Sequence, residues 1–349
     1  MFEELLNNKD TWLSGKGPFS EIIFSSRVRL ARNFSDYPFP ARASSAQKEK
    51  ILKTMEEARA RIDLLKEAVF FRMEDIDDID RQFLLERHLI SQEHMHTTKG
   101  KGLILSLDEK VALMINEEDH LRMQAMASGF DLNRAYETIN AIDDSIAKLV
   151  DFSFMSNLGY LTSCPTNVGT ALRASCMLHL PALTFTKRIN KVLELLAKIS
   201  FATRGFFGEG TQALGDFFQI SNQISLGLSE MEVIDNLAGV VNQVKEQEID
   251  ARAVLIKKHK LELEDNVWRS YGVLRSCRLV SSKEALSHLS ILSLGLDLGI
   301  IDKISRELLN NLFLMIQPAH LQKVEARVLK EGERDFIRAQ ILRERLGEA

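Results

Sequence analysis

Five arginines are spaced along the chain so that together they could bind an anion. Arg27 and Arg29 lie on the polar side of one alternating segment, and Arg122 and Arg173 on the polar side of two others, whereas Arg204 opens a glycine-bounded loop over residues 204–210. One such arginine is most often solvated, in a surface ion pair worth less than ~1 kcal/mol. Converging guanidinium groups repel one another unless an anion neutralises them, and their planar forks fit phosphate oxygens. We therefore expect a polyphosphate ligand.

Side chains would have to bind that ligand. The chain contains neither a Gly-x-x-x-x-Gly-Lys-Ser/Thr loop nor a Gly-x-Gly-x-x-Gly fingerprint, the two common ways of binding phosphates with backbone amides. The acidic run Glu117-Glu118-Asp119 offers carboxylates for proton transfer. It is equally typical of a solvated turn between strands, and its spacing alone does not separate the two interpretations.

The segments that carry the arginines alternate as half-buried strands do. In residues 21–32, Val28 and Leu30 fall on one face and the arginines on the other. The stretch that begins at Lys110 and the stretch Leu172–Leu180 show the same period of two. This period predicts strands that each bury one face and direct the arginines to the opposite face.

Helical patterns separate these strands. Asp131 can cap a helix that runs toward Val150, and Ser229 with Glu232 forms a capping box before another apolar pattern. The irregular alternation of strands and helices favours an α+β fold with an antiparallel sheet flanked by helices, because a doubly wound parallel sheet needs regular alternation.

The C-terminal part of the chain changes to helical periodicity. Ser281 and Glu284 form a second possible capping box, and the helical pattern continues from Ala285 to Ile316. We therefore expect two domains, a catalytic domain over residues 1–260 and a smaller helical domain over residues 261–349.

Composition narrows the class of protein. The 349 residues carry a net charge of -4 and are 45% hydrophobic, which is typical of a soluble globular protein and argues against direct binding of nucleic acid. The three cysteines, Cys164, Cys176 and Cys277, show no paired spacing, so we expect neither disulfides nor a protein-bound metal. No signal peptide or membrane span is evident, and a cytoplasmic protein is expected.

Two longer motifs resemble those of a known superfamily. Residues 116–122 read Asn-Glu-Glu-Asp-His-Leu-Arg and residues 164–170 read Cys-Pro-Thr-Asn-Val-Gly-Thr. Both are similar to the hallmark motifs of the ATP:guanido phosphotransferases, the phosphagen kinase superfamily. Residues 25–33 and 204–209 extend the resemblance, which covers roughly residues 20–250. It implies a guanido kinase catalytic fold, the substrate ATP and the cofactor Mg²⁺.

The resemblance also implies roles for matching positions. Glu118 matches the catalytic carboxylate, Glu209 a second carboxylate that holds the substrate guanidinium, and Cys164 a reactive thiol against the same group. A guanidinium is a poor nucleophile, so one nitrogen must be oriented toward the γ-phosphorus and must lose its proton during attack. The residues that match nucleotide contacts are Arg27, Arg29, His88, Arg122, Arg173 and Arg204.

Three features resemble the bacterial protein arginine kinase (McsB) branch of this superfamily. Few residues precede the first arginine strand, Phe206-Phe207 follow Arg-Gly, and a helical region is added at the C-terminus. Residues 334–339, Arg-Asp-Phe-Ile-Arg-Ala, resemble a phosphoarginine-binding motif of that branch. By this resemblance Arg334, Asp335 and Arg338 would bind phosphoarginine. Without it, Arg334 and Arg338 are an i, i+4 pair on an exposed helix.

The branch implies protein substrates that bear arginine, a stress-response role and a homodimer. It also implies three partners: a zinc-binding activator protein, a repressor of heat-shock genes and a Clp-type protease. Two other functions remain open, a kinase of small guanidines such as free arginine and a non-catalytic adaptor that binds phosphoarginine. The full set of arginines and carboxylates speaks against the adaptor.

Overall fold

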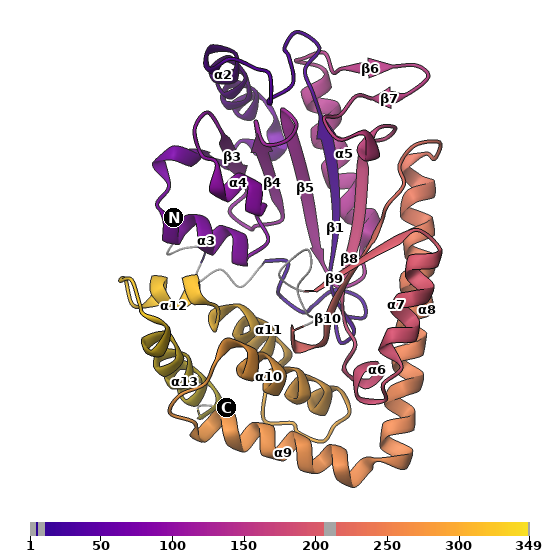
Figure 1. The fold of residues 1–349 in the computed structure, drawn as a ribbon, viewed down its shortest axis with the longest axis vertical. Helices are drawn as coiled ribbons and strands as arrows, with labels where there is room; N and C mark the ends of the chain where they lie inside the picture. The colour runs from indigo at the N-terminus through magenta and orange to yellow at the C-terminus, as the bar shows by residue number, and fades with distance from the viewer. Residues whose placement is uncertain (1–4, 6–10, 206–213, 348–349) are drawn as a thin grey trace.

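A single large sheet forms the centre of the molecule. The computed structural model describes residues 5, 11–205 and 214–347, and its eight-stranded sheet has the order β2-β3-β4-β5-β1-β8-β10-β9, with every neighbouring pair antiparallel (Figure 1). The strands are β1 (Ile23–Arg32), β2 (Val69–Arg72), β3 (Gly102–Leu105), β4 (Val111–Ile115), β5 (Leu121–Ser128), β8 (Leu172–His179), β9 (Phe201–Gly205) and β10 (Phe217–Asn222), and a separate hairpin pairs β6 (Phe154–Met155) with β7 (Gly159–Tyr160).

Helices flank this sheet. α5 packs against β1 and β5, and α8 packs against β8 and β10, so one face of the sheet is covered by these two helices. The helices of this part are α2 (Ser45–Arg61), α3 (Asp78–Glu86), α4 (Gln92–His96), α5 (Leu132–Ala147), α6 (Pro181–Phe185), α7 (Ile189–Lys198) and α8 (Glu230–Lys258), with short 3₁₀ turns η1 (Asp63–Leu65), η2 (Met73–Asp75), η3 (Pro165–Asn167) and η4 (Leu214–Asp216).

Five helices follow α8 in the part of the chain that the structure describes, which ends at residue 347. They are α9 (Lys260–Ser276), α10 (Ser282–Asp297), α11 (Arg306–Met315), α12 (Pro318–Val324) and α13 (Glu331–Gly347). α9 packs on α10 and α13, whereas α12 packs on α3. Figure 1 shows this group below the sheet, with α12 beside α3.

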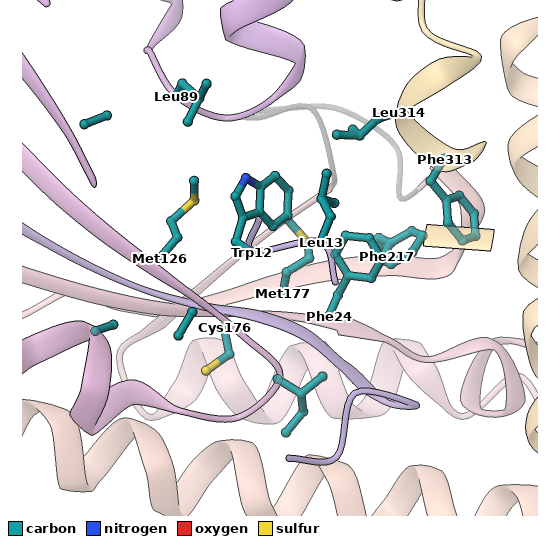
Figure 2. Close-up of a cluster of buried hydrophobic side chains, with 14 of the residues drawn as sticks. Trp12, Leu13, Phe24, Leu89, Met126, Cys176, Met177, Phe217, Phe313 and Leu314 are labelled. Carbon is teal, nitrogen blue, oxygen red and sulfur yellow. The ribbon is translucent and has the colours of Figure 1, made fainter. Parts of the chain in front are cut away.

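The C-terminal helices share the hydrophobic core of the sheet. The rings of Phe217 on β10 and Phe313 on α11 are 4.8 Å apart, and Phe24 on β1 lies 5.1 Å from Phe217 (Figure 2). His179 on β8 hydrogen-bonds to Ser290 on α10 at 2.8 Å. His179 and Phe217 are directly opposed in the sheet, so these helices pack on one face of the sheet near its end.

A buried carboxylate also joins the two parts of the chain. Glu86, at the end of α3, accepts hydrogen bonds from the backbone N–H groups of Ala319 and His320 and from Nδ1 of His320, at 2.8–3.2 Å. Both Glu86 and His320 are buried. A carboxylate at this place satisfies the free N–H groups that begin α12 and lies at the positive end of its dipole.

The expected α+β fold with an antiparallel sheet is confirmed. Asp131 and Ser229 cap α5 and α8, and Ser281 caps α10. The helical pattern from Ala285 to Ile316 proves to be two helices, α10 and α11, because the chain turns between them near Gly299, whose φ is 67°. Within the described part of the chain, none of the helices has the length and apolar character required to cross a membrane.

Candidate functional site

Four arginines share one face of the sheet. Arg29 on β1 is directly opposite Arg173 on β8 and, on its other side, opposite Gln124 on β5. Arg27 and Arg122 are two residues from Arg29 and Gln124 along their strands. Because opposed and alternate residues of a sheet point to the same face, these arginines converge as the sequence predicts. The opposite face is apolar.

Arg204 joins this set from a strand. It lies in β9, opposite Gln219, which is in turn opposite Met177 on β8. Met177 alternates with Arg173, so Arg204 shares the arginine face. The expectation that Arg204 opens a loop is therefore wrong, because its backbone pairs with β10. Residues 206–213, which include Glu209, lie outside the described residues.

The convergence is electrostatically costly for the protein. Burial, followed by the charges of Arg122, Arg173 and Arg204, lowers the pKa of Arg27 to about 9, which leaves this guanidinium charged at neutral pH. Burial and the same kind of neighbours also lower the pKa of Arg29 well below its usual value. Arg29 Nε is buried and has no hydrogen-bond partner among the described residues. Phosphate oxygens would both neutralise the cluster and accept this hydrogen bond.

Two carboxylates of the acidic run are buried and hydrogen-bonded, and the third is exposed. Glu117 is buried, and both of its oxygens accept from Arg122 at 2.8 Å. Asp119 is also buried and accepts from Asn33 Nδ2 at 2.6 Å. Glu118 is exposed between them. Its pKa is raised by partial burial and then by the charges of Asp119 and Glu117. Only Glu118 in this run is placed to exchange protons with a ligand.

Two adjoining cavities lie over the arginine face. One, of ≈ 370 Å³, is lined by Glu118 and Cys164 together with four of the arginines. The other, of ≈ 670 Å³, adds Arg27 and His88. Glu118 and two arginines line both cavities. The arginines of the first cavity are Arg29, Arg122, Arg173 and Arg204. The site residues predicted on the sheet and its loops are thus brought together, apart from Glu209.

His88 and Cys164 occupy defined positions in these cavities. The backbone of His88 is left-handed, with φ 58°, and its carbonyl accepts from Gln124 Nε2 at 2.8 Å. Burial, together with the charge of Arg27, lowers the pKa of His88 to about 3, so its ring is neutral. Cys164 is partly buried, with its Sγ 2.9 Å from Thr166 Oγ1.

The C-terminal motif lies on α13, away from the arginine face. Arg338 is 1% exposed and donates to the carbonyls of Ile316 and Val280 at 2.8 Å and to Asp335. The interpretation of Arg334 and Arg338 as an exposed pair is therefore wrong for Arg338, which holds α13 against the ends of two neighbouring helices.

Sequence analysis missed three contributors to the site. Gln219 lines the ≈ 670 Å³ cavity opposite Arg204, and Asn33 orients Asp119. Asn33 ends the motif of residues 25–33, a signal that was available. Trp12 precedes every recognised motif, and only the fold places it near Arg27. Among the described residues, no three His, Cys, Asp or Glu side chains cluster as a metal site.

The comparisons with known proteins agree with this geometry. Residues 50–251 match the family model of the ATP:guanido phosphotransferase, C-terminal catalytic domain, and residues 260–349 match that of the protein-arginine kinase McsB C-terminal domain. The chain is 44% identical over 345 residues to the protein-arginine kinase of Halothermothrix orenii, covering 99% of both chains. It belongs to the protein-arginine kinase family. The chain is also 45% identical to the protein-arginine kinase of Bacillus subtilis, over 96% of this chain and 93% of that one.

Solved structures place this protein-arginine kinase family member among guanidino kinases. A duplicated taurocyamine kinase from Schistosoma mansoni with bound transition-state analogue components is 27% identical, with a TM-score of 0.60, over 67% of this chain and 34% of that one. Lombricine kinase has a TM-score of 0.61 at 24% identity, over 68% and 69% of the two chains, and shares the fold. The match to the ATP:guanido phosphotransferase model and the curated relatives together identify the chain as a kinase that uses ATP.

Proposed function

We propose that this site transfers the γ-phosphoryl group of ATP to the guanidinium of arginine side chains in proteins. The observation that carries the proposal is one cavity in which an exposed glutamate and four arginines of the same sheet face come together. The positive charges of the arginines would neutralise the triphosphate, and Glu118 would accept the proton that the attacking nitrogen must lose.

In this mechanism the guanidinium nitrogen forms a bond to the γ-phosphorus as the bond from that phosphorus to the β,γ-bridging oxygen breaks. ADP leaves, and the proton of the attacking nitrogen passes to Glu118. Arg29, Arg122, Arg173 and Arg204 stabilise the charge on the transferring group. Mg²⁺ bound to the phosphates would neutralise part of the same charge.

Two further residues complete the proposed acceptor site. Cys164 lines the same cavity as Glu118 and would pack against the acceptor guanidinium. Glu209 would hold that guanidinium as a bidentate partner. Arg27 and His88, in the adjoining cavity, would contact the nucleotide on the side away from the acceptor.

We also propose a phosphoarginine site at Arg334, Asp335 and Arg338. Arg338 would act mainly by fixing α13 and orienting Asp335, with which it is paired. Arg334, which is partly exposed, would supply the fork for the phosphate. The division into a catalytic domain, residues 1–260, and a C-terminal domain, residues 261–349, is part of the same proposal.

The cellular proposal rests on family resemblance. It comprises a cytoplasmic stress-response enzyme that marks proteins for a Clp-type protease, with a heat-shock gene repressor as a substrate and a zinc-binding activator protein. A homodimer would use exposed apolar side chains of the C-terminal part, where Leu261 is 82% and Leu279 64% exposed. Such side chains are common at protein interfaces.

The direct test offers the enzyme ATP with either free arginine or a casein-like protein. Acid-labile, base-stable phosphate on the protein is the expected product, and Glu118→Ala should form none. Phosphate on free arginine alone would favour the small-guanidine kinase. Binding of phosphoarginine proteins without any transfer would favour the adaptor.

A further inference from the structure

A narrow slot opens off the proposed nucleotide cavity. It is lined by Trp12 and Ser25 together with Arg27, His88 and Gln219. The last three residues also line the ≈ 670 Å³ cavity, so the two spaces adjoin. The family models assign residues 50–251 and 260–349, and Trp12 belongs to neither.

The slot lies in a defined direction along β1. Arg29 lines the cavity that contains Glu118, Arg27 lines the next cavity, and Ser25 lines the slot. These residues alternate on one face of the strand, so Arg29 and Ser25 are about 13 Å apart at 3.3 Å per residue. A nucleotide whose terminal phosphate lies at Arg29 and whose chain follows β1 therefore brings its base toward the slot.

Trp12 is held firmly at the far wall of this slot. Its side chain is 1% exposed, and its ring meets those of Phe24 and His88 edge-on at 5.9 and 5.8 Å. Figure 2 shows the indole above Met177, with its nitrogen on the side of Met126 and away from the phenylalanine cluster. Met126 lines the slot. Packing thus fixes the direction of the indole N–H.

Among the residues that the structure describes, the indole nitrogen has no hydrogen-bond partner. Trp12 Nε1 is buried and has no hydrogen-bond partner among the described residues, although buried indole N–H groups usually find one. Leaving such a donor unsatisfied is unfavourable, because the buried N–H has lost its hydrogen bond to water. The slot has room for ≈ 20 Å³, which is about one water-sized group. It fits the edge of a planar ring, while the ring itself stays in the larger cavity.

We propose that Trp12 is a base-contacting residue of the kinase, whose Nε1–H donates a hydrogen bond to a ring nitrogen of adenine. The inference rests on the proposed function, because it takes the arginine face as the triphosphate site. The neutral ring of His88 and the amide of Gln219 flank the same entrance and would border the base there.

The two tryptophans of the chain allow a clean optical test. Trp268 is 46% exposed on α9, and Trp268→Phe leaves Trp12 as the single tryptophan. In this variant, saturating ATP should change the intensity and the wavelength of Trp12 emission, with a midpoint that agrees with ATP binding measured by calorimetry. Unchanged emission in an enzyme that transfers phosphate would overturn the proposal.

Analogues of ATP test the hydrogen bond itself. Trp12→Phe keeps an aromatic ring but removes the donor, so KM for ATP should rise about tenfold, the effect of about 1.4 kcal/mol, with kcat within twofold. With the Trp268→Phe enzyme, which keeps Trp12, one of 1-deaza-, 3-deaza- and 7-deaza-ATP should show the same rise in KM relative to ATP, because that analogue lacks the accepting ring nitrogen. The Trp12→Phe enzyme should then have the same KM for that analogue as for ATP.

The remaining outcomes are equally decisive. If no deaza analogue is discriminated by the Trp268→Phe enzyme, a structural water satisfies the indole and the proposal fails. The analogue series uses native Trp12, so it gives an answer even if Trp12→Phe does not fold. If the wild-type enzyme transfers phosphate to no guanidinium while ATP still shifts Trp12 emission, the proposed function fails and the base contact stands.

Discussion

Glu118 is the one exposed carboxylate of its run, and its raised pKa gives the first prediction. A base must be deprotonated to accept a proton, so kcat should fall as pH drops through this raised pKa. The acid limb should therefore lie at a higher pH than the pKa of an ordinary glutamate. Glu118→Gln should reduce kcat by about 10²–10⁴-fold and leave calorimetric ATP binding nearly unchanged. Near-native turnover would show that Glu118 is not the base.

Arg173 tests whether the arginines act as forks or as point charges. It lies directly opposite Arg29, and its Nη2 donates to Ser221 at 3.2 Å. Arg173→Lys keeps the charge but loses the planar fork, so kcat should fall by about 10²–10³-fold. The control is Arg269→Lys, on the exposed surface of α9, which should change nothing. Substantial activity in Arg173→Lys would argue against bidentate phosphate contacts.

At the scale of elements, Glu86 joins α3 to α12. Glu86→Ala leaves the first N–H groups of α12 and the ring of His320 without their acceptor, so the free energy of unfolding should fall by about 2–4 kcal/mol. Urea denaturation followed by circular dichroism measures the change. Glu262→Ala, an exposed glutamate on α9, should lie within about 0.5 kcal/mol of wild type. Equal midpoints for the two variants would contradict the role of Glu86.

The motif on α13 makes a separate prediction. Arg334→Ala should weaken calorimetric binding of free phosphoarginine by at least about tenfold, since one charge-assisted hydrogen bond contributes about 1.5–3 kcal/mol. Arg345→Ala, an exposed arginine of the same helix, is the matched control. Arg338→Ala is less informative, because this arginine also holds the carbonyls of Ile316 and Val280. Equal affinity in wild type and Arg334→Ala would return the motif to a structural role.

The elements around the site were largely predictable because their signals are local. The alternation of apolar and polar residues predicts β1, β4, β5 and β8, and the capping residues Asp131 and Ser229 predict the starts of α5 and α8. The strand position of Arg204 was not predictable, because β9 exists through its pairing with β10. The role of Glu117 was hidden for a similar reason. It is an ion-pair partner of Arg122, a contact that only the folded turn creates.

Packing between distant segments was the least predictable part. Nothing local in residues 11–13 indicates that Trp12 lies beside His88, and nothing in residues 334–338 indicates that Arg338 is buried. Both results come from the way whole elements meet in the core. Sequence motifs identified which residues carry chemistry, whereas the neighbours that orient them depend on tertiary contacts.

At the scale of the whole molecule, the arginine face makes stability depend on anions. Repulsion among buried guanidinium groups opposes folding, and a bound polyphosphate relieves it. ATP at one hundred times its Kd should stabilise the fold by about 2.7 kcal/mol, seen as a higher Tm. Arg29→Leu should raise the Tm without nucleotide and reduce the response to ATP. Sodium chloride at the same ionic strength is the control. If ATP raises the Tm of Arg29→Leu as much as that of the wild type, this account is contradicted.

The shared core has a consequence for how such a kinase can change by recombination. The two family matches meet between residues 251 and 260, yet Phe217 packs on Phe313 and Glu86 holds the start of α12 across that junction. A gene fusion that joins this catalytic half to a foreign C-terminal half would leave the buried carboxylate of Glu86 without its hydrogen-bond donors and the ring of Phe217 without its packing partner. The halves must therefore be inherited and altered together, and a chimera becomes viable only when the residues on both sides of the junction are exchanged as a set.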